Sequence, residues 1–151
     1  MTVQSVAVTY PVYARVTGSN ATTTGQTLVD IAGLSIALAI NSVYEFEAVL
    51  SVQSSSTAGN KYGVNYSVAG GAVEAQIRGT LAAATSRADR ISALNTATPA
   101  YVVIAATGGI HIKGIITTGA NAGNLTIQHL KVTSGTSTVF INSFLKVTKV
   151  A

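Results

Sequence analysis

The feature that most constrains the fold of this chain is a two-residue alternation of apolar and polar side chains. The alternation runs through residues 34–40, 44–52, 62–68 and 73–78, and it returns in shorter stretches from residue 101 onward. Successive side chains of a strand point to opposite faces, so this period predicts strands with one buried face. Turn-forming segments such as "SSSTAGNK" and "TGANAGN" separate the stretches. The sequence therefore predicts an all-β fold, an antiparallel β-sandwich of jelly-roll-like type.

Two segments depart from this alternation. Residues 80–94, "TLAAATSRADRISAL", contain alanines that favour a helix, and a short turn or an irregular crossover is the alternative. Residues 1–26 contain Pro11 and the polar run "TGSNATTTGQ". We expect residues 1–26 to form an extended N-terminal arm and residues 27–151 to form the sandwich domain. A simple edge strand is the alternative for the arm.

The charge content restricts the kinds of partner. Charged residues make up only 9% of the chain, against about 25% in typical soluble domains. The net charge of +4 comes from nine Lys and Arg residues that are scattered along the sequence, whereas nucleic-acid binding usually requires a concentrated basic face. A weakly charged surface allows close contact with other chains, because few ions must lose their water. We expect protein partners and no nucleic acid.

The sequence shows no pattern of a membrane or thiol-based role. It contains no cysteine, and its first residues lack a charged leader followed by an apolar run. The most apolar stretch, "LVDIAGLSIALAI", contains Asp30, and it is shorter than the roughly 20 residues that a membrane span needs. We therefore expect no membrane association.

Both histidines lie in "GIHIKGIITTGANAGNLTIQHLKV", which we expect to form a hairpin. In the register that best separates apolar from polar residues, Ile112 faces His129 and His111 faces Leu130. The imidazoles then point to opposite sides of one sheet and cannot share a metal ion or a proton. We expect His129 to be a hydrogen-bonded core residue, His111 to be an exposed strand residue, and the chain to hold no metal or cofactor.

Two glutamates are the best candidates for catalysis. Glu45 and Glu47 share one face of a strand, with side chains about 7 Å apart, a separation found in glycoside hydrolases. Catalytic carboxylates must oppose each other across a bond, however, and neighbours on one strand flank no cleft. We expect this pair to belong to a solvated or interface face, and we expect no catalytic residues and no enzymatic activity.

The segment "YPVY" offers a different kind of site. Tyr10 and Tyr13 flank the rigid Pro11, and exposed aromatic side chains supply contact area at a low entropic cost. Packing across one end of the sandwich is the alternative. The residues expected at a partner or oligomer interface are Val8, Tyr10, Pro11, Tyr13, Arg15, Glu45, Glu47 and His111.

Three segments resemble small β-sandwich proteins of tailed-bacteriophage virions, found in head decoration proteins and in tail or fibre components. They are residues 27–50 with a "Y-x-F-E" strand, residues 108–132 with "G-x-I-x-T" and "G-x-L-x-x-Q", and residues 141–150 with "S-x-L-K-V". The last pattern usually has Gly before the Ser, and here Asn142 stands there. The resemblance covers residues 27–150 and implies a structural binding protein, commonly a homotrimer, without catalytic residues.

From the resemblance and the low charge we expect a capsid decoration (cement) protein that binds the major capsid protein or other virion proteins and bridges capsomers. Its location would be the virion, after synthesis in the host cytoplasm. The alternative is a tail, collar or fibre module that attaches to a host glycan, which predicts exposed aromatic residues such as Tyr62 and Tyr66. A soluble carbohydrate-binding module is a third possibility, and a glycan-active enzyme using Glu45 and Glu47 is the rival from another class.

Overall fold

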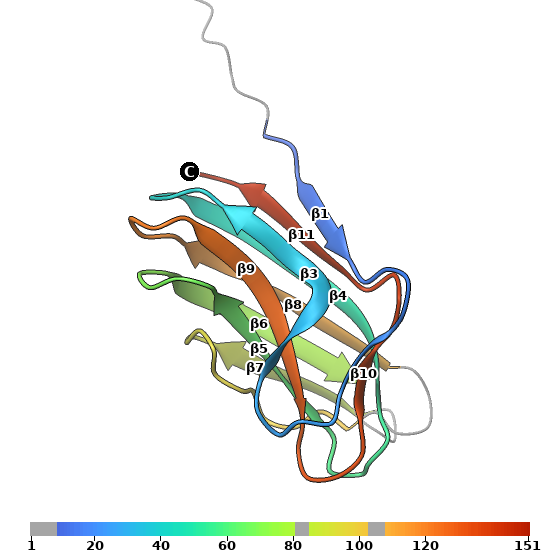
Figure 1. Ribbon diagram of the computed structural model, residues 1–151. Helices are drawn as coiled ribbons and strands as arrows, with labels where there is room; N and C mark the ends of the chain where they lie inside the picture. Colours follow the sequence, from blue (N-terminus) through green and yellow to red (C-terminus); the bar gives the residue numbers. More distant parts are fainter. Residues whose placement is uncertain (1–8, 81–84, 103–107) are drawn as a thin grey trace, which may run out of the picture.

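The computed structural model describes residues 9–80, 85–102 and 108–151. Eleven strands are formed within these ranges (Figure 1). They are β1 (Val12–Arg15), β2 (Ala21–Thr23), β3 (Val29–Leu38), β4 (Val43–Ser54), β5 (Asn60–Tyr66), β6 (Ala72–Thr80), β7 (Ser86–Ile91), β8 (Gly108–Thr117), β9 (Gly123–Lys131), β10 (Ser137–Val139) and β11 (Phe144–Lys149). None of the described residues is helical.

The strands form two antiparallel sheets of unequal size. The large sheet has the order β1-β11-β4-β8-β6-β7, with β10 pairing β4 and β2 pairing β10 at one end. The small sheet has the order β3-β9-β5, and Figure 1 shows it as a separate layer over the large one. The predicted antiparallel β-sandwich is thus confirmed.

The core between the sheets follows the alternation in the sequence. In β4 the side chains at alternate positions from Tyr44 to Val52 are at most 8% exposed. The same holds for Tyr62, Val64 and Tyr66 of β5 and for alternate residues of β6. Ile40, which continues the pattern in sequence, lies beyond the end of β3 and is 48% exposed.

The described part of the expected arm contributes strands to the large sheet. β1 pairs with β11, so that Tyr13 lies opposite Lys146 and Arg15 opposite Phe144. β2 pairs with β10. These pairings correspond to the edge-strand alternative. Residues 9–11, which precede β1, are exposed.

The predicted hairpin of residues 109–132 is wrong. β8 pairs with β4 and β6 in the large sheet, whereas β9 pairs with β3 and β5 in the small sheet. Alternation shows which face of a strand is buried, but it does not show which strand lies beside it. Residues 118–122 carry the chain between the sheets, and the Thr118 hydroxyl anchors this crossing by donating to the Ala39 carbonyl at 2.7 Å.

The possible helix of residues 80–94 is also absent from the described part of that range. Residues 86–91 form β7, which pairs with β6 as an edge strand of the large sheet. Alternating contacts explain this outcome: Arg87 and Asp89 bond to each other at 2.6 Å on one side of β7, and Arg90 reaches Glu74 on the other. The helix propensity of alanine is small and is overridden by such tertiary contacts.

The motif residues of the resemblance have structural roles here. Thr118 also accepts a bond from the Ser42 amide at 3.0 Å, and Gln128 donates to Asp30 at 2.9 Å. Asn142 has a φ of 70°, a left-handed conformation that Gly and Asn adopt more readily than other residues. Asn142 therefore suits the position at which the pattern usually has Gly.

Candidate binding face

The two sheets differ in how their outer sides are covered. On the outer side of the small sheet, Thr126 and Gln128 are each only 4% exposed, and the segment around Thr96 packs close to Gly63. The outer side of the large sheet has no such cover within the described residues, and its side chains reach solvent. We call this surface the open face.

Register places the side chains of the open face in rows across the strands. One row crosses β1, β11, β4, β8 and β6, and it contains Arg15, Phe144, Val49, His111 and Arg78. The next row contains Tyr13, Lys146, Glu47, Lys113, Gln76 and Arg90. The open face therefore mixes aromatic, apolar and charged groups from six strands.

Glu47 is the electrostatic centre of the open face. Its carboxylate lies 2.8 Å from Lys146 Nζ on β11 and 2.8 Å from His111 Nε2 on β8. The hydrogen bond from Lys146, and then the one from His111, lower the pKa of Glu47. The carboxylate thus stays ionised and ties three neighbouring strands together.

The other carboxylates of the open face are paired as well. Glu45 lies 3.3 Å from Lys113, and Glu74 lies 2.7 Å from Arg90. Arg15 and Arg78 have no carboxylate partner within the described residues, and Arg78 donates instead to the Gln76 side chain at 3.2 Å. The face therefore has two cations in excess, and both lie in the row through Val49.

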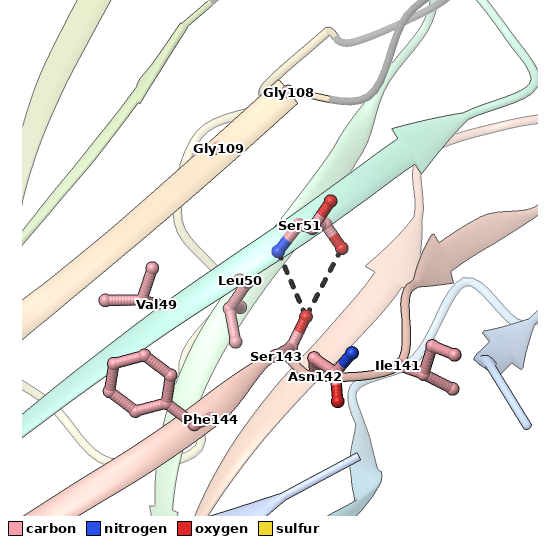
Figure 2. Close-up of a pocket in the computed structure, with 9 residues that line it drawn as sticks. All are labelled: Val49, Leu50, Ser51, Gly108, Gly109, Ile141, Asn142, Ser143 and Phe144. Atoms are coloured by element: carbon pink, nitrogen blue, oxygen red, sulfur yellow. Dashed lines mark hydrogen bonds between the residues drawn. The ribbon is translucent and has the colours of Figure 1, made fainter. Parts of the chain in front are cut away.

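A shallow apolar hollow of about 370 Å³ lies at one end of the open face (Figure 2). Val49, Ile141 and the Phe144 ring surround it, and Val49 and Ile141 are 38% and 47% exposed. Gly109 leaves it open, since a Cβ atom built there would meet no atom within 4 Å. The full lining is Val49, Leu50, Ser51, Gly108, Gly109, Ile141, Asn142, Ser143 and Phe144.

One side of the apolar hollow is held in place by a serine. Ser143 Oγ accepts a hydrogen bond from the Ser51 amide at 3.0 Å, and Figure 2 shows this link between β4 and the residue before β11. Because Ser143 is 2% exposed, the link is shielded from water. The hollow is therefore part of the folded frame of the sandwich.

A second hollow of about 250 Å³ lies farther along the open face. Gln76, Arg78, His111 and Lys113 line it. His111 and Lys113 are paired with Glu47 and Glu45, so Arg78 is the cation of this basic hollow that has no carboxylate partner among the described residues. His111 and Val49 are register neighbours, and thus the two hollows lie side by side.

The structure brings several of the expected interface residues together. Tyr13, Arg15, Glu45, Glu47 and His111 all lie on the open face. Tyr10 is 77% exposed just before β1, beside the exposed Pro11. Tyr13 is 62% exposed and its ring contacts Phe144 at 6.2 Å between centroids. Val8 lies outside the described residues.

Sequence reasoning missed the residues that complete the open face. The sequence pattern places Phe144 and Lys146 only in the segment 141–150 and Arg78 only in the alternating stretch 73–78, and it gives no partner strand for either. A signal was present for Val49 and Ile115, because both are apolar at positions that the alternation assigns to the polar face. They are 38% and 40% exposed.

The histidines lie in different sheets. His129 is 2% exposed and its Nδ1 lies 3.0 Å from Ser137 Oγ, as expected of a hydrogen-bonded core residue. Burial lowers its pKa to about 4. The His111 side chain is 44% exposed, but it bonds to Glu47. In the described ranges no three His, Asp or Glu side chains are grouped so as to hold a metal ion.

The geometry does not suit Glu47 for acid catalysis of glycoside cleavage. A general acid needs a raised pKa, whereas the cations beside Glu47 lower its pKa.

The glycan-binding alternative predicted that Tyr62 and Tyr66 are exposed, and this prediction is wrong. They are 0% and 4% exposed, because both rings point into the core between the sheets.

Comparisons with known proteins give little information on this chain. The sequence matches no family model, and no curated protein is similar to it. A solved structure that matches is "Structure of infectious bursal disease virus Gt strain", at 9% identity and a TM-score of 0.23. The match covers 95% of this chain but only 39% of the viral one, and a TM-score this low carries no argument about function. Within the described residues no helix is long and apolar enough to cross a membrane.

Proposed function

We propose that this chain is a non-enzymatic virion structural protein, a capsid decoration (cement) protein of a tailed bacteriophage. It binds the major capsid protein or a neighbouring virion protein on the outer shell and bridges capsomers as a homotrimer. The observation that supports this proposal best is the open face, which carries exposed apolar groups among charges that are already paired. Such a surface can be buried against a protein without stranding many ions.

The size of the open face is compatible with this role. Six strands at about 4.8 Å spacing and three rows of side chains, the third through Glu45, Ile115 and Glu74, give a surface of roughly 25 by 20 Å. Stable protein interfaces bury about 800 Å² of accessible surface on each partner, and a flat surface of these dimensions measures about 500 Å², so the open face can supply the larger part of such an interface. Repetition of the contact over a shell would add avidity.

Binding to shells is the direct test. Heads of the phage that encodes this chain, prepared without the protein, are mixed with purified protein and sedimented. We expect saturable co-sedimentation, and light scattering of the free protein should give a trimeric mass that survives dilution. Failure to bind heads, together with recovery of the protein from tails, would refute decoration and favour the tail or fibre alternative.

A further inference from the structure

We infer that the open face binds an acidic protein segment, in which an apolar side chain enters the apolar hollow and a carboxylate enters the basic hollow. This inference rests on the proposed function and specifies the chemistry of the partner. The two hollows are neighbours on the same row of side chains, which runs from Phe144 and Val49 through His111 to Arg78. A partner that fills both must therefore present the two groups at a fixed separation.

Charge complementarity indicates the sign of the partner. Glu45, Glu47 and Glu74 are each paired with a basic side chain of the same face. Arg78 is left without a carboxylate within the described residues, and it lines the basic hollow beside His111 and Lys113, whose charges Glu47 and Glu45 already match. Arg15 is the second unmatched cation, and it lies at the other end of the same row.

The spacing of the row fits a peptide in the polyproline II conformation that crosses the strands. The strands that carry Val49 and Arg78 are separated by two inter-strand steps, or about 10 Å. Three residues of a polyproline II peptide span about 9 Å and return the side chain to the same side, whereas side chains three residues apart in a β-strand point to opposite sides. The best-fitting segment therefore has a carboxylate three residues from an apolar side chain, and a second carboxylate on the other side can approach Arg15.

Other occupants fit less well. A nucleic acid would bring phosphates against Glu45, Glu47 and Glu74 on the same face. A second copy of this chain carries a net charge of +4, and its own open face has the same unmatched cations. An acidic protein surface is the partner whose negative charge is opposite to that of the unmatched Arg15 and Arg78.

A palindromic peptide, acetyl-DSTLTSD-amide, tests the inference, because it presents the required spacing in either direction. It is titrated into the ¹⁵N-labelled protein at low salt, and amide shifts report where it binds. We expect the shifts to map to Gly109, His111 and Arg78. The peptide acetyl-NSTLTSN-amide lacks both carboxylates and should bind at least about fivefold more weakly, since about fivefold is the upper end for loss of a single exposed ion pair.

Three variants separate the contributions. Arg78→Ser removes the unmatched cation and should weaken binding of the acidic peptide by about fivefold. Gly109→Leu should fill the apolar hollow and abolish the shifts there, and its Cβ atom would meet no atom within 4 Å. Lys61→Ser, on the small sheet, makes the same change in net charge and should leave binding unchanged.

The outcomes distinguish this inference from the proposed function. Equal binding of both peptides, absence of shifts on the open face, or tighter binding of an oligothymidylate would overturn the inference. Head binding that Arg78→Ser and Gly109→Leu leave intact would also overturn it while the decoration role stands. Peptide binding that follows the expected pattern, without any binding to heads, would support the inference and refute the decoration role.

Discussion

Acidification should destabilise this protein through one buried histidine. His129 is 2% exposed in the core beside Ser137, and burial lowers its pKa from an ordinary 6.5 to about 4. The unfolded chain therefore binds a proton more readily than the folded chain between these two values. Stability from the neutral imidazole is complete above pH 6.5, and it is lost as the pH falls toward 4.

The magnitude follows from proton linkage. With pKa values of 6.5 unfolded and about 4 folded, the free energy of unfolding falls by about 2 kcal/mol between pH 7 and pH 5. Glu47 and Asp89 also have lowered pKa values. Their contributions are lost mainly below their ordinary values of 4.5 and 3.8, so the interval from pH 7 to pH 5 isolates the histidine.

The assay is urea unfolding at pH 7 and pH 5, followed by the fluorescence of the six tyrosines in this tryptophan-free chain. The matched variant is His129→Gln, which keeps a polar partner for Ser137 and does not titrate. We expect the parent to lose about 2 kcal/mol between the two pH values and the variant to lose a few tenths. An equal loss in both proteins would refute the assignment to His129.

Substitutions at three further positions test the frame of the sandwich by thermal or urea unfolding. Thr118→Val removes the bonds to Ala39 and Ser42 and should cost about 1–3 kcal/mol; an unchanged stability would show that the crossing between the sheets does not depend on them. Gly114→Ala would push a Cβ atom into the β6 backbone near Glu74, and we expect a loss of about 1–3 kcal/mol. Asn142→Gly should be neutral, whereas Asn142→Val should cost about 1–2 kcal/mol because of its left-handed φ; equal stability of the two would contradict this account.

The alternation in the sequence predicted the buried faces well but not the strand order. In β4, the residues from Tyr44 to Val52 were assigned to the correct faces because burial of one side is a local property of each strand. The pairing of β8 with β4 and β6 depends instead on the route of residues 118–122, along which Thr118 bonds to Ala39 and Ser42. A short connection with turn-forming residues looks the same whether it closes a hairpin or joins two sheets.

The candidate site was predictable only in part, for the same reason. Glu45, Glu47 and His111 were chosen because polar residues of a strand face outward, and they do lie on one face. The partners of Glu47 could not be found, because Lys146 lies about a hundred residues away in sequence and reaches it only through the pairing of β11 with β4. That Arg78 is an unmatched cation is evident only from the structure, which shows that the glutamates of the face are paired with other basic side chains.

The arrangement of charges bears on how an open sheet face can meet water alone and, in the proposed role, be covered by a partner. Basic side chains of the same face neutralise Glu45, Glu47 and Glu74, so a partner need not supply positive charges for these glutamates. Breaking a buried pair costs far more than covering an intact one. What remains available is the apolar hollow beside Val49 and the excess positive charge of Arg15 and Arg78 in the same row. Affinity should therefore concentrate along this row, and the paired charges around it should set the orientation of the partner.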